Sequence, residues 1–225
     1  MEVAAALRAR NVAVHVVALD DIPMARVLGN DVGVFMQTLH EKHGVMFHLG
    51  TSVVAVERDR VQLKEGSWLS ADLVIAGIGV RPATALAAEA GLTVDNGVIV
   101  NEYLESSVPG VYAAGDIARW PADANGTSMR VEHWIMAERQ GQTAARNMLG
   151  GRKQFDAVPF FWTEQYDVTL LYTGHAERGF TTTVVGSLDV ARPDCRVEYR
   201  QGDTLVAVAT IGRDVESLNA EVQLE

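Results

Sequence analysis

The stretch at residues 108–117, VPGVYAAGDI, constrains the fold of this chain more than any other. Its apolar run at residues 111–114 predicts a buried strand, which ends at Gly115 and is followed at once by Asp116. Glycine lacks a Cβ, so a ligand can approach the backbone closely there. Open α/β sheets bind ligands at the carboxyl ends of strands, where an acid can accept hydrogen bonds from hydroxyl groups. A Gly-Asp pair alone is more often a strand-end turn with an acidic cap. The neighbouring segments are therefore needed to choose between such a turn and a ligand site.

The N-terminal part of the chain has the pattern of an α/β layer. Residues 12–19 form a continuous run rich in β-branched side chains, which is typical of a buried parallel strand. Helices are predicted over residues 1–10 and about 31–43, the second capped by Asp31, and residues 45–49 predict the next strand. The buried face of the second helix is predicted to hold Val32, Phe35, Met36 and Leu39.

The middle of the chain combines short strands with one long helix. Residues 51–71 predict an antiparallel meander, 72–76 a fully buried strand and 97–100 a further short strand. A loop from Asp116 to about residue 131 and a long helix over 132–148 are predicted next. A narrow stripe on that helix predicts that another segment packs very close to it, and the stripe consists of Ala137, Gly141, Ala144 and Met148.

The C-terminal part is predicted to be mostly β. Gly150 and Gly151 mark a boundary, and a last short helix is predicted after Asp214. The segment between them predicts a small α+β domain with an antiparallel sheet. Its strands are predicted at residues 158–162, 168–173, 181–185, 196–199 and 205–211.

Charge and composition exclude several classes of function. The 225 residues suffice for one to two domains. A formal net charge of −10 argues against nucleic acid or an anionic membrane surface as partner. No apolar run approaches the roughly 18 residues that indicate a membrane span. The single cysteine, Cys195, allows no intrachain disulfide and no thiolate zinc cage, and it fits a reducing, cytoplasmic compartment.

Five segments of the chain occur in a characteristic order. A strand-helix-strand layer is followed by GIGVRP at residues 77–82, VYAAGD at 111–116, VEHW at 131–134 and VPFFWTEQYD at 158–167. The ordered set resembles the FAD-dependent pyridine nucleotide-disulfide oxidoreductase superfamily, in its branch of ferredoxin reductases and apoptosis-inducing-factor-like proteins. The resemblance covers essentially the whole chain.

The resemblance implies an α/β fold with partial Rossmann-like FAD- and NAD(P)-binding layers in a three-layer arrangement, followed by the small α+β domain. Residues 1–76 then correspond to a nicotinamide-binding domain that lacks its first strand and Gly-rich turn. Residues 77–150 correspond to the C-terminal part of the FAD-binding domain. Residues 151–225 correspond to the C-terminal reductase domain, which is of the dimerisation or interface type.

The resemblance also implies cofactor contacts. Asp116 matches the acid that binds the ribityl chain of the flavin, and Gly115 matches the small residue that permits this approach. Gly79 lies where the nicotinamide cofactor passes. Two further groups would lie against the isoalloxazine, namely the helix start Glu132, His133 and Trp134 and the aromatic pair Phe161 and Trp162.

Two groups of titratable residues have competing interpretations. Glu132 is the one acid considered for proton transfer at the flavin edge, yet an acid that caps the helix is an equally good interpretation. His40, His43 and His48 suggest a metal cluster, but their spacing is more typical of surface and edge histidines, so no metal site is predicted.

The chain departs from the family pattern in its phosphate-binding turns. The family has two Gly-x-Gly-x-x-Gly turns, one for each dinucleotide, and this sequence has neither. The chain is therefore expected to be a fragment or an N-terminally truncated gene product. The acid that binds a ribose 2′-hydroxyl is expected at the end of the strand, where Ala18 stands, and Asp20 and Asp21 lie just beyond it. Arg26 is the nearest following cation. Two acids disfavour a 2′-phosphate, which favours NADH over NADPH.

Two functions follow from these observations. The first is the C-terminal portion of a flavoenzyme that passes electrons from NAD(P)H through FAD to a ferredoxin- or Rieske-type iron–sulfur acceptor, either as a monomer or as a homodimer. The second is a catalytically inactive remnant that serves as a binding or assembly module, which the absent glycine turns support.

Overall fold

The computed structural model describes residues 1–121 and 128–224. These residues form two compact units. The first unit contains Met1–Gly77 together with Trp162–Leu224, and the second contains Ile78–Phe161. Segments from both ends of the chain therefore fold into the same unit.

The N-terminal segment of the first unit is a small α/β layer. Helix α1 (Glu2–Arg8) leads into strand β1 (Val14–Val17), which pairs in parallel with β2 (Val45–His48). Ala4, Val14 and Val45 form a buried cluster between them. The predicted parallel strands are confirmed, although both are shorter than the sequence pattern indicated.

Helix α2 (Ala25–Lys42) connects β1 to β2 and begins earlier than predicted. Gly29 interrupts it with a φ of 78° and a ψ of 168°, so a first turn precedes the regular part that the sequence pattern located. The helical periodicity is readable only after this break, which explains the wrong starting point. The predicted buried face is confirmed, since Val32, Phe35, Met36 and Leu39 are each at most 3% exposed.

The meander predicted over residues 51–71 is confirmed. Strands β3 (Val53–Val56), β4 (Arg60–Leu63) and β5 (Trp68–Ser70) form an antiparallel sheet in that order. Leu63 is buried at its centre, and the Arg60 guanidinium lies 4.2 Å from the centre of the Trp68 ring.

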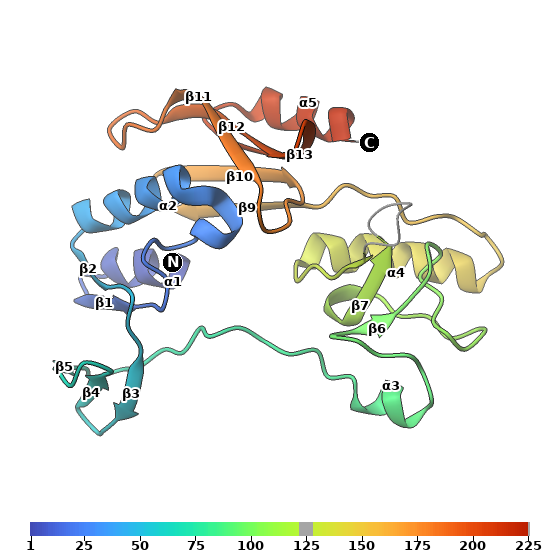
Figure 1. Cartoon of the computed structure of the whole chain (residues 1–225), viewed down its shortest axis with the longest axis horizontal. Coiled ribbons are helices and arrows are strands. Elements are labelled where there is room, and N and C mark those ends of the chain that lie inside the picture. Colours follow the sequence, from blue (N-terminus) through green and yellow to red (C-terminus); the bar gives the residue numbers. More distant parts are fainter. Residues whose placement is uncertain (122–127, 225) are drawn as a thin grey trace. The chain divides into compact units, whose positions relative to one another are not determined.

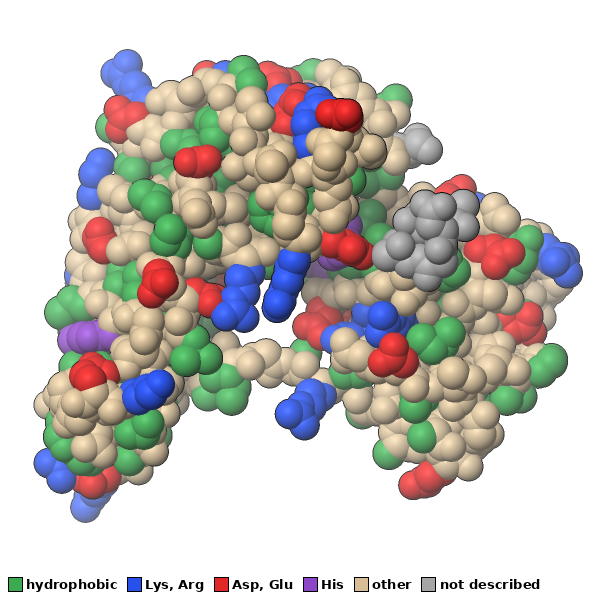
Figure 2. Space-filling view, viewed as in Figure 1, with side chains coloured by type: hydrophobic (Ala, Val, Ile, Leu, Met, Phe, Trp, Pro, Cys, Tyr) green, Lys and Arg blue, Asp and Glu red, His purple; other side chains and the backbone are tan. Residues whose placement is uncertain are grey.

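The prediction of a buried strand at residues 72–76 is wrong. The segment is extended, but no strand among the described residues pairs with it, and Figure 1 shows it as a single run between β5 and α3 (Ala85–Glu89). Its apolar side chains are exposed to solvent, with Leu73 at 70%, Ile75 at 55% and Ile78 at 95%. The same segment is a thin row of atoms in the space-filling view of Figure 2. A run of aliphatic residues indicates that the side chains favour burial. A β-strand also needs a neighbouring strand that pairs with its backbone N–H and C=O groups.

The C-terminal segment forms the predicted antiparallel sheet, in the order β11-β12-β13-β10-β9, with α5 packed against it. Tyr199 in this sheet donates a hydrogen bond to the Leu28 carbonyl oxygen at 2.8 Å, which attaches α2 to the sheet. The elements are β9 (Phe160–Gln165), β10 (Val168–Gly174), β11 (Thr181–Ser187), β12 (Asp194–Gln201), β13 (Thr204–Ile211) and α5 (Asp214–Leu224).

The contact between α2 and this segment corrects one of the histidine predictions. His40 is 0% exposed and contacts the end of β9, so it is a core residue rather than a surface histidine. Residues on α2 and β9 lie far apart in the sequence, and their contact is a property of the tertiary structure.

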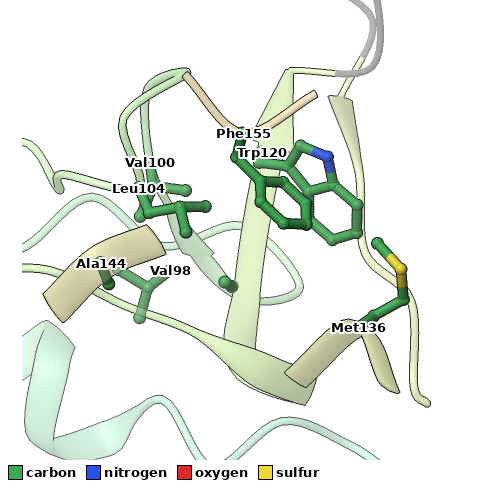
Figure 3. Close-up of a cluster of buried hydrophobic side chains, with 8 residues drawn as sticks. Val98, Val100, Leu104, Trp120, Met136, Ala144 and Phe155 are labelled. Atoms are coloured by element: carbon green, nitrogen blue, oxygen red, sulfur yellow. The ribbon is translucent and has the colours of Figure 1, made fainter. Parts of the chain in front are cut away.

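The second unit is built around helix α4 (Trp134–Met148) and a small sheet. In this sheet β6 (Val98–Ile99) pairs in parallel with β7 (Ala118–Pro121), and β7 pairs with β8 (Ser128–Met129). The loop predicted after Asp116 therefore contains short strands. The core of this unit is drawn in Figure 3. In it the Trp120 and Phe155 rings pack edge to face, with 5.6 Å between their centres.

Helix α4 buries a different stripe from the predicted one. Gly141 and Met148 are exposed, whereas Met136, Gln140, Thr143, Ala144 and Asn147 are buried. The prediction relied on small and apolar residues and omitted polar ones. The polar side chains are buried because they hydrogen-bond to the backbone, as Asn147 does to the carbonyl oxygens of Tyr103 and Lys153 at 2.8 Å.

We expect thermolysin, which cuts before large aliphatic residues, to cleave the chain first within residues 72–80. The backbone there has no strand partner in the described part of the chain and its aliphatic side chains are exposed, so cleavage needs little local unfolding. Mass spectrometry of the earliest fragments checks this. First cleavage within β10 or β13, whose aliphatic residues are buried in the sheet, contradicts it.

Candidate functional site

The segment before Gly115 is extended but is not the predicted strand. Residues 111–114 are only partly buried, and their one bridge joins Tyr112 to Glu105. No neighbouring strand covers both sides of the segment among the described residues. The predicted turn is present, because the extended Ala114 is followed by a single 3-10 turn, η1 (Gly115–Ile117).

Gly115 is a position where glycine is needed. Its φ is +80°, a left-handed conformation that L-amino acids with a side chain rarely adopt. A Cβ built at this position lies 3.3 Å from the Ala137 Cβ on α4. Its N–H donates to the Gln140 Oε1 atom at 2.7 Å. The turn is thus held against α4 by one hydrogen bond and by the absence of a side chain.

Gln140 is the main site residue that the sequence did not reveal. It is 1% exposed, and its Nε2 atom has no hydrogen-bond partner among the described residues. Because Oε1 accepts the Gly115 N–H, turning the amide round would place two donors against each other. Nothing in the sequence marks Gln140, since a glutamine on a helix is usually a solvent-facing residue.

Asp116 lies on the exposed side of the turn, and charged groups surround it. Its carbonyl oxygen accepts a hydrogen bond from Arg130 Nη1 at 2.8 Å, and the same nitrogen lies 2.6 Å from Glu132 Oε1. Glu132 is therefore in an ion pair with Arg130, whose side chain is 12% exposed. The N-cap of α4 is His133 and no side chain caps it, so Glu132 does not cap this helix.

His133 connects this turn to two aromatic rings. The centre of its ring lies 6.2 Å from the centre of the Trp134 ring and 6.4 Å from the centre of the Phe161 ring. Burial lowers the pKa of His133, while the Asp116 carboxylate acts in the opposite direction. Since the net shift is downward, the imidazole is largely neutral at pH 7. Trp134 is 61% exposed at the start of α4.

The predicted site residues thus divide between the two units. The second unit brings together Gly115, Asp116, Glu132, His133, Trp134 and Phe161. Trp162 belongs to the first unit, where it lies half-buried in β9. Gly79 lies in the extended segment with a φ of +95° and has no atom within 4 Å of the position of a Cβ.

Asp20 follows β1, as predicted, but it is not an isolated acid. Its carboxylate forms an ion pair with Arg26. The formal charges of this pair cancel, so only the Asp21 carboxylate is left to repel a 2′-phosphate. The preference for NADH over NADPH has less support from the structure than from the sequence.

The described residues contain neither a candidate metal site nor a candidate membrane-spanning helix. Within them, no three or more histidine, cysteine, aspartate or glutamate side chains gather closely enough to hold a metal ion. None of the helices in residues 1–121 and 128–224 has the length and hydrophobicity needed to span a bilayer.

Comparison with known families identifies the fold. A family model described as pyridine nucleotide-disulphide oxidoreductase matches residues 1–141, more than half of the chain. The chain belongs to this family. A second model, described as reductase C-terminal, matches residues 160–222, which include all five strands of the C-terminal antiparallel sheet. The resemblance inferred from the motifs and the predicted fold class are both confirmed.

Individual members of the oxidoreductase family show the extent of the match. Putidaredoxin reductase of Pseudomonas putida is 38% identical, with 96% of this chain and 52% of the relative covered. Apoptosis-inducing factor 3 of Homo sapiens is 36% identical, with 95% of this chain and 36% of the relative covered. The crystal structure of the covalent putidaredoxin reductase–putidaredoxin complex matches with a TM-score of 0.92 at 35% identity, covering 99% of this chain and 54% of that one. The chain spans about half, or less, of the length of these proteins.

We expect Gly115→Ala to destabilise the chain more than Gly110→Ala. Both glycines have a φ of +80°, so both alanine variants place a side chain on a left-handed backbone. The added Cβ meets Ala137 at position 115, whereas at position 110 it meets nothing within 4 Å. The difference in the free energy of unfolding should be about 1–3 kcal/mol, measured by urea denaturation. Equal losses in the two variants contradict the close contact.

Gln140→Leu should release the Gly115 N–H without a large loss of stability. The leucine removes the acceptor of that N–H, but it also removes the unpaired Nε2 donor, so one buried unpaired group replaces another. Amide exchange of Gly115 should accelerate about tenfold while the free energy of unfolding falls by less than about 1.5 kcal/mol. The exposed Gln142→Leu is the matched control, and unchanged Gly115 exchange in Gln140→Leu argues against the bond.

Proposed function

We propose that this chain forms the electron-transferring core of a flavin-dependent NAD(P)H oxidoreductase. In the complete protein, electrons pass from the nicotinamide cofactor through FAD to a ferredoxin- or Rieske-type iron–sulfur acceptor. The observation that carries this proposal is the Gly115-Asp116 turn held against α4 by Gln140. Membership of the oxidoreductase family supports the reaction type.

The residues of the turn fit a flavin on their own chemistry. The missing side chain of Gly115 lets the turn pack against Ala137 on α4, which fixes the place where Asp116 emerges. The exposed Asp116 carboxylate can accept hydrogen bonds from the hydroxyl groups of a ribityl chain. A bound flavin would accept a hydride and release electrons singly. Within this chain, Gly115 and Asp116 would hold the sugar-like portion of the cofactor.

The start of α4 would supply the electrostatic contribution. The exposed N–H groups of a helix N-terminus favour negative charge, which suits an electron-rich ring system. His133, Trp134 and Phe161 lie close together at this helix start and would pack against the ring. Trp162 follows Phe161 in the sequence and is proposed as a further flavin contact. Glu132 is paired with Arg130, so proton transfer by Glu132 requires that ion pair to open.

The two cofactors would be held by different segments. We propose that residues 1–76 carry part of the nicotinamide site, with Asp20 near the ribose. Gly79, just after this segment, would lie beside the path of the nicotinamide cofactor. Residues 77–150 would carry part of the FAD site, and 151–225 the C-terminal domain. The phosphate-binding Gly-x-Gly-x-x-Gly turns of both sites are absent from this sequence, so the residues named here would make up only part of each site.

An iron–sulfur protein is the proposed electron acceptor. One matching structure is described as a covalent complex of putidaredoxin reductase with putidaredoxin. A further relative, from Burkholderia cepacia, is described as the ferredoxin–NAD(+) reductase component of an anthranilate 1,2-dioxygenase system. We propose a cytoplasmic location and an assembly that is either monomeric or homodimeric.

Titration with FAD tests the proposal, with flavin fluorescence as the readout. Asp116→Asn should weaken binding about 10- to 100-fold, the size expected when a charged hydrogen-bond acceptor is lost. The matched control is Asp167→Asn, another exposed acid next to a turn, which should bind like the unmodified chain. If the unmodified chain leaves FAD fluorescence unchanged, the alternative of a non-catalytic binding or assembly module is favoured for this chain.

A further inference from the structure

The buried His40 takes part in a continuous chain of side-chain hydrogen bonds in the first unit. Tyr166 Oη lies 3.2 Å from His40 Nδ1, and His40 Nε2 lies 2.5 Å from Gln165 Oε1. Gln165 Nε2 donates to Thr163 Oγ1 at 3.0 Å, and Thr163 Oγ1 donates to Glu2 Oε1 at 2.6 Å. The chain therefore runs from a phenol to a carboxylate through an imidazole.

When His40 is neutral, the donors and acceptors of this chain admit one arrangement. A carboxylate only accepts, so the Thr163 hydroxyl donates to Glu2 and accepts from the Gln165 amide nitrogen. The Gln165 amide oxygen must then accept, which makes His40 Nε2 the donor. In a neutral imidazole Nδ1 is left as an acceptor, and the Tyr166 hydroxyl donates to it. A neutral His40 therefore carries its proton on Nε2, and the neutral form is favoured because burial lowers the pKa of His40 more than the hydrogen bond to Gln165 raises it.

This chain connects three elements that are distant in sequence. Glu2 lies on α1, His40 on α2, and Thr163 and Gln165 on β9. Successive side chains of a strand point to opposite faces, so Trp162 projects from the face of β9 opposite to Thr163 and Gln165. Thr163, Gln165 and His40 are 6%, 1% and 0% exposed, so the connection lies in the interior.

We propose that His40 is a positioning residue. Its neutral Nε2–H form holds β9 against α1 and α2, and this contact fixes the position of the strand that carries Trp162. The link from Trp162 to electron transfer rests on the function proposed above. The positioning of β9 does not, since it depends only on contacts within the first unit.

Protonation of His40 should loosen this arrangement. An imidazolium has a second N–H, on Nδ1, and the Tyr166 hydroxyl that faces it would have to turn from donor to acceptor. The nearby groups are the Met1 amino group, Glu2 and Arg8 from α1, His43 from α2, and Tyr166 from the turn after β9. The Phe47 ring from β2 contributes no charge. Burial lowers the pKa of His40, and the positive charges of Met1 and His43 act in the same direction.

The direction of the pH effect follows from this lowered pKa. The unfolded chain binds a proton near the ordinary pKa of about 6.5, whereas the folded chain binds it at lower pH. The contribution of His40 to stability is therefore complete above about pH 6.5 and is lost as the pH falls through that value toward the folded pKa.

Nitrogen-15 NMR of the histidine rings in the full chain tests the proposal directly. We expect His40 to remain in the Nε2–H tautomer below pH 6.5, where a solvent-exposed imidazole of ordinary pKa is mostly charged. Gln165→Glu should raise the His40 pKa by about 1–3 units, because a carboxylate replaces the neutral acceptor and favours the imidazolium. His15→Asn is the control, and it should leave the His40 titration unchanged.

Hydrogen exchange of the Thr163 and Gln165 amides provides the second measurement. His40→Leu removes both hydrogen bonds and should accelerate this exchange about tenfold, whereas His40→Gln keeps a donor for Gln165 and should restore part of the protection. A residue that only fills space would give equal effects in the two variants. The proposal is overturned if His40 titrates near pH 6.5 like a solvent-exposed imidazole, if Gln165→Glu leaves the His40 pKa unchanged, or if leucine and glutamine act alike. None of these readouts needs flavin, so failure here is distinct from failure to bind FAD.

Discussion

The first unit depends on helix α2 having two partners. Its apolar face, with Phe35 and Met36, is buried, and the Tyr199 hydroxyl attaches its first turn to the C-terminal sheet. A Cβ at Gly29 would lie 2.9 Å from Thr182 Cγ2, so the helix and the sheet meet where a side chain has no room. Residues from the two ends of the sequence form one unit because this helix contacts both the parallel pair β1–β2 and the antiparallel sheet.

The second unit uses the same principle on a smaller scale. Helix α4 holds a left-handed glycine through Gln140, and the glycine in turn determines where the Asp116 carboxylate emerges. Polar side chains on a buried helix face contribute little net stability, but an unmade bond is costly, so they select one geometry over its neighbours. A cofactor site benefits from this selectivity, because cofactor contacts need fixed positions more than they need binding energy.

The sequence predicted elements better than it predicted contacts. Period-2 and period-3.6 patterns located the meander, the C-terminal strands and the long helix, because those signals lie within single elements. The predicted strand at 72–76 was wrong because aliphatic composition cannot show whether a partner strand is present. The predicted stripe on α4 was wrong for a related reason, since burial of Gln140 and Asn147 depends on backbone groups elsewhere in the chain. His40 was assigned to the surface because its partners, Gln165 and Tyr166, lie on a distant strand and turn.

The exposed segment at residues 72–80 has a consequence for handling this protein. Its backbone N–H and C=O groups are not paired with another strand in the described residues, and aliphatic side chains flank them. An extended segment with unpaired backbone groups can pair with another extended, hydrophobic peptide, because backbone hydrogen bonds do not depend on the side-chain sequence. Self-association through it would be open-ended rather than closed by symmetry. Light scattering across a range of concentrations is therefore the measurement that separates a defined oligomer of this chain from growing assemblies.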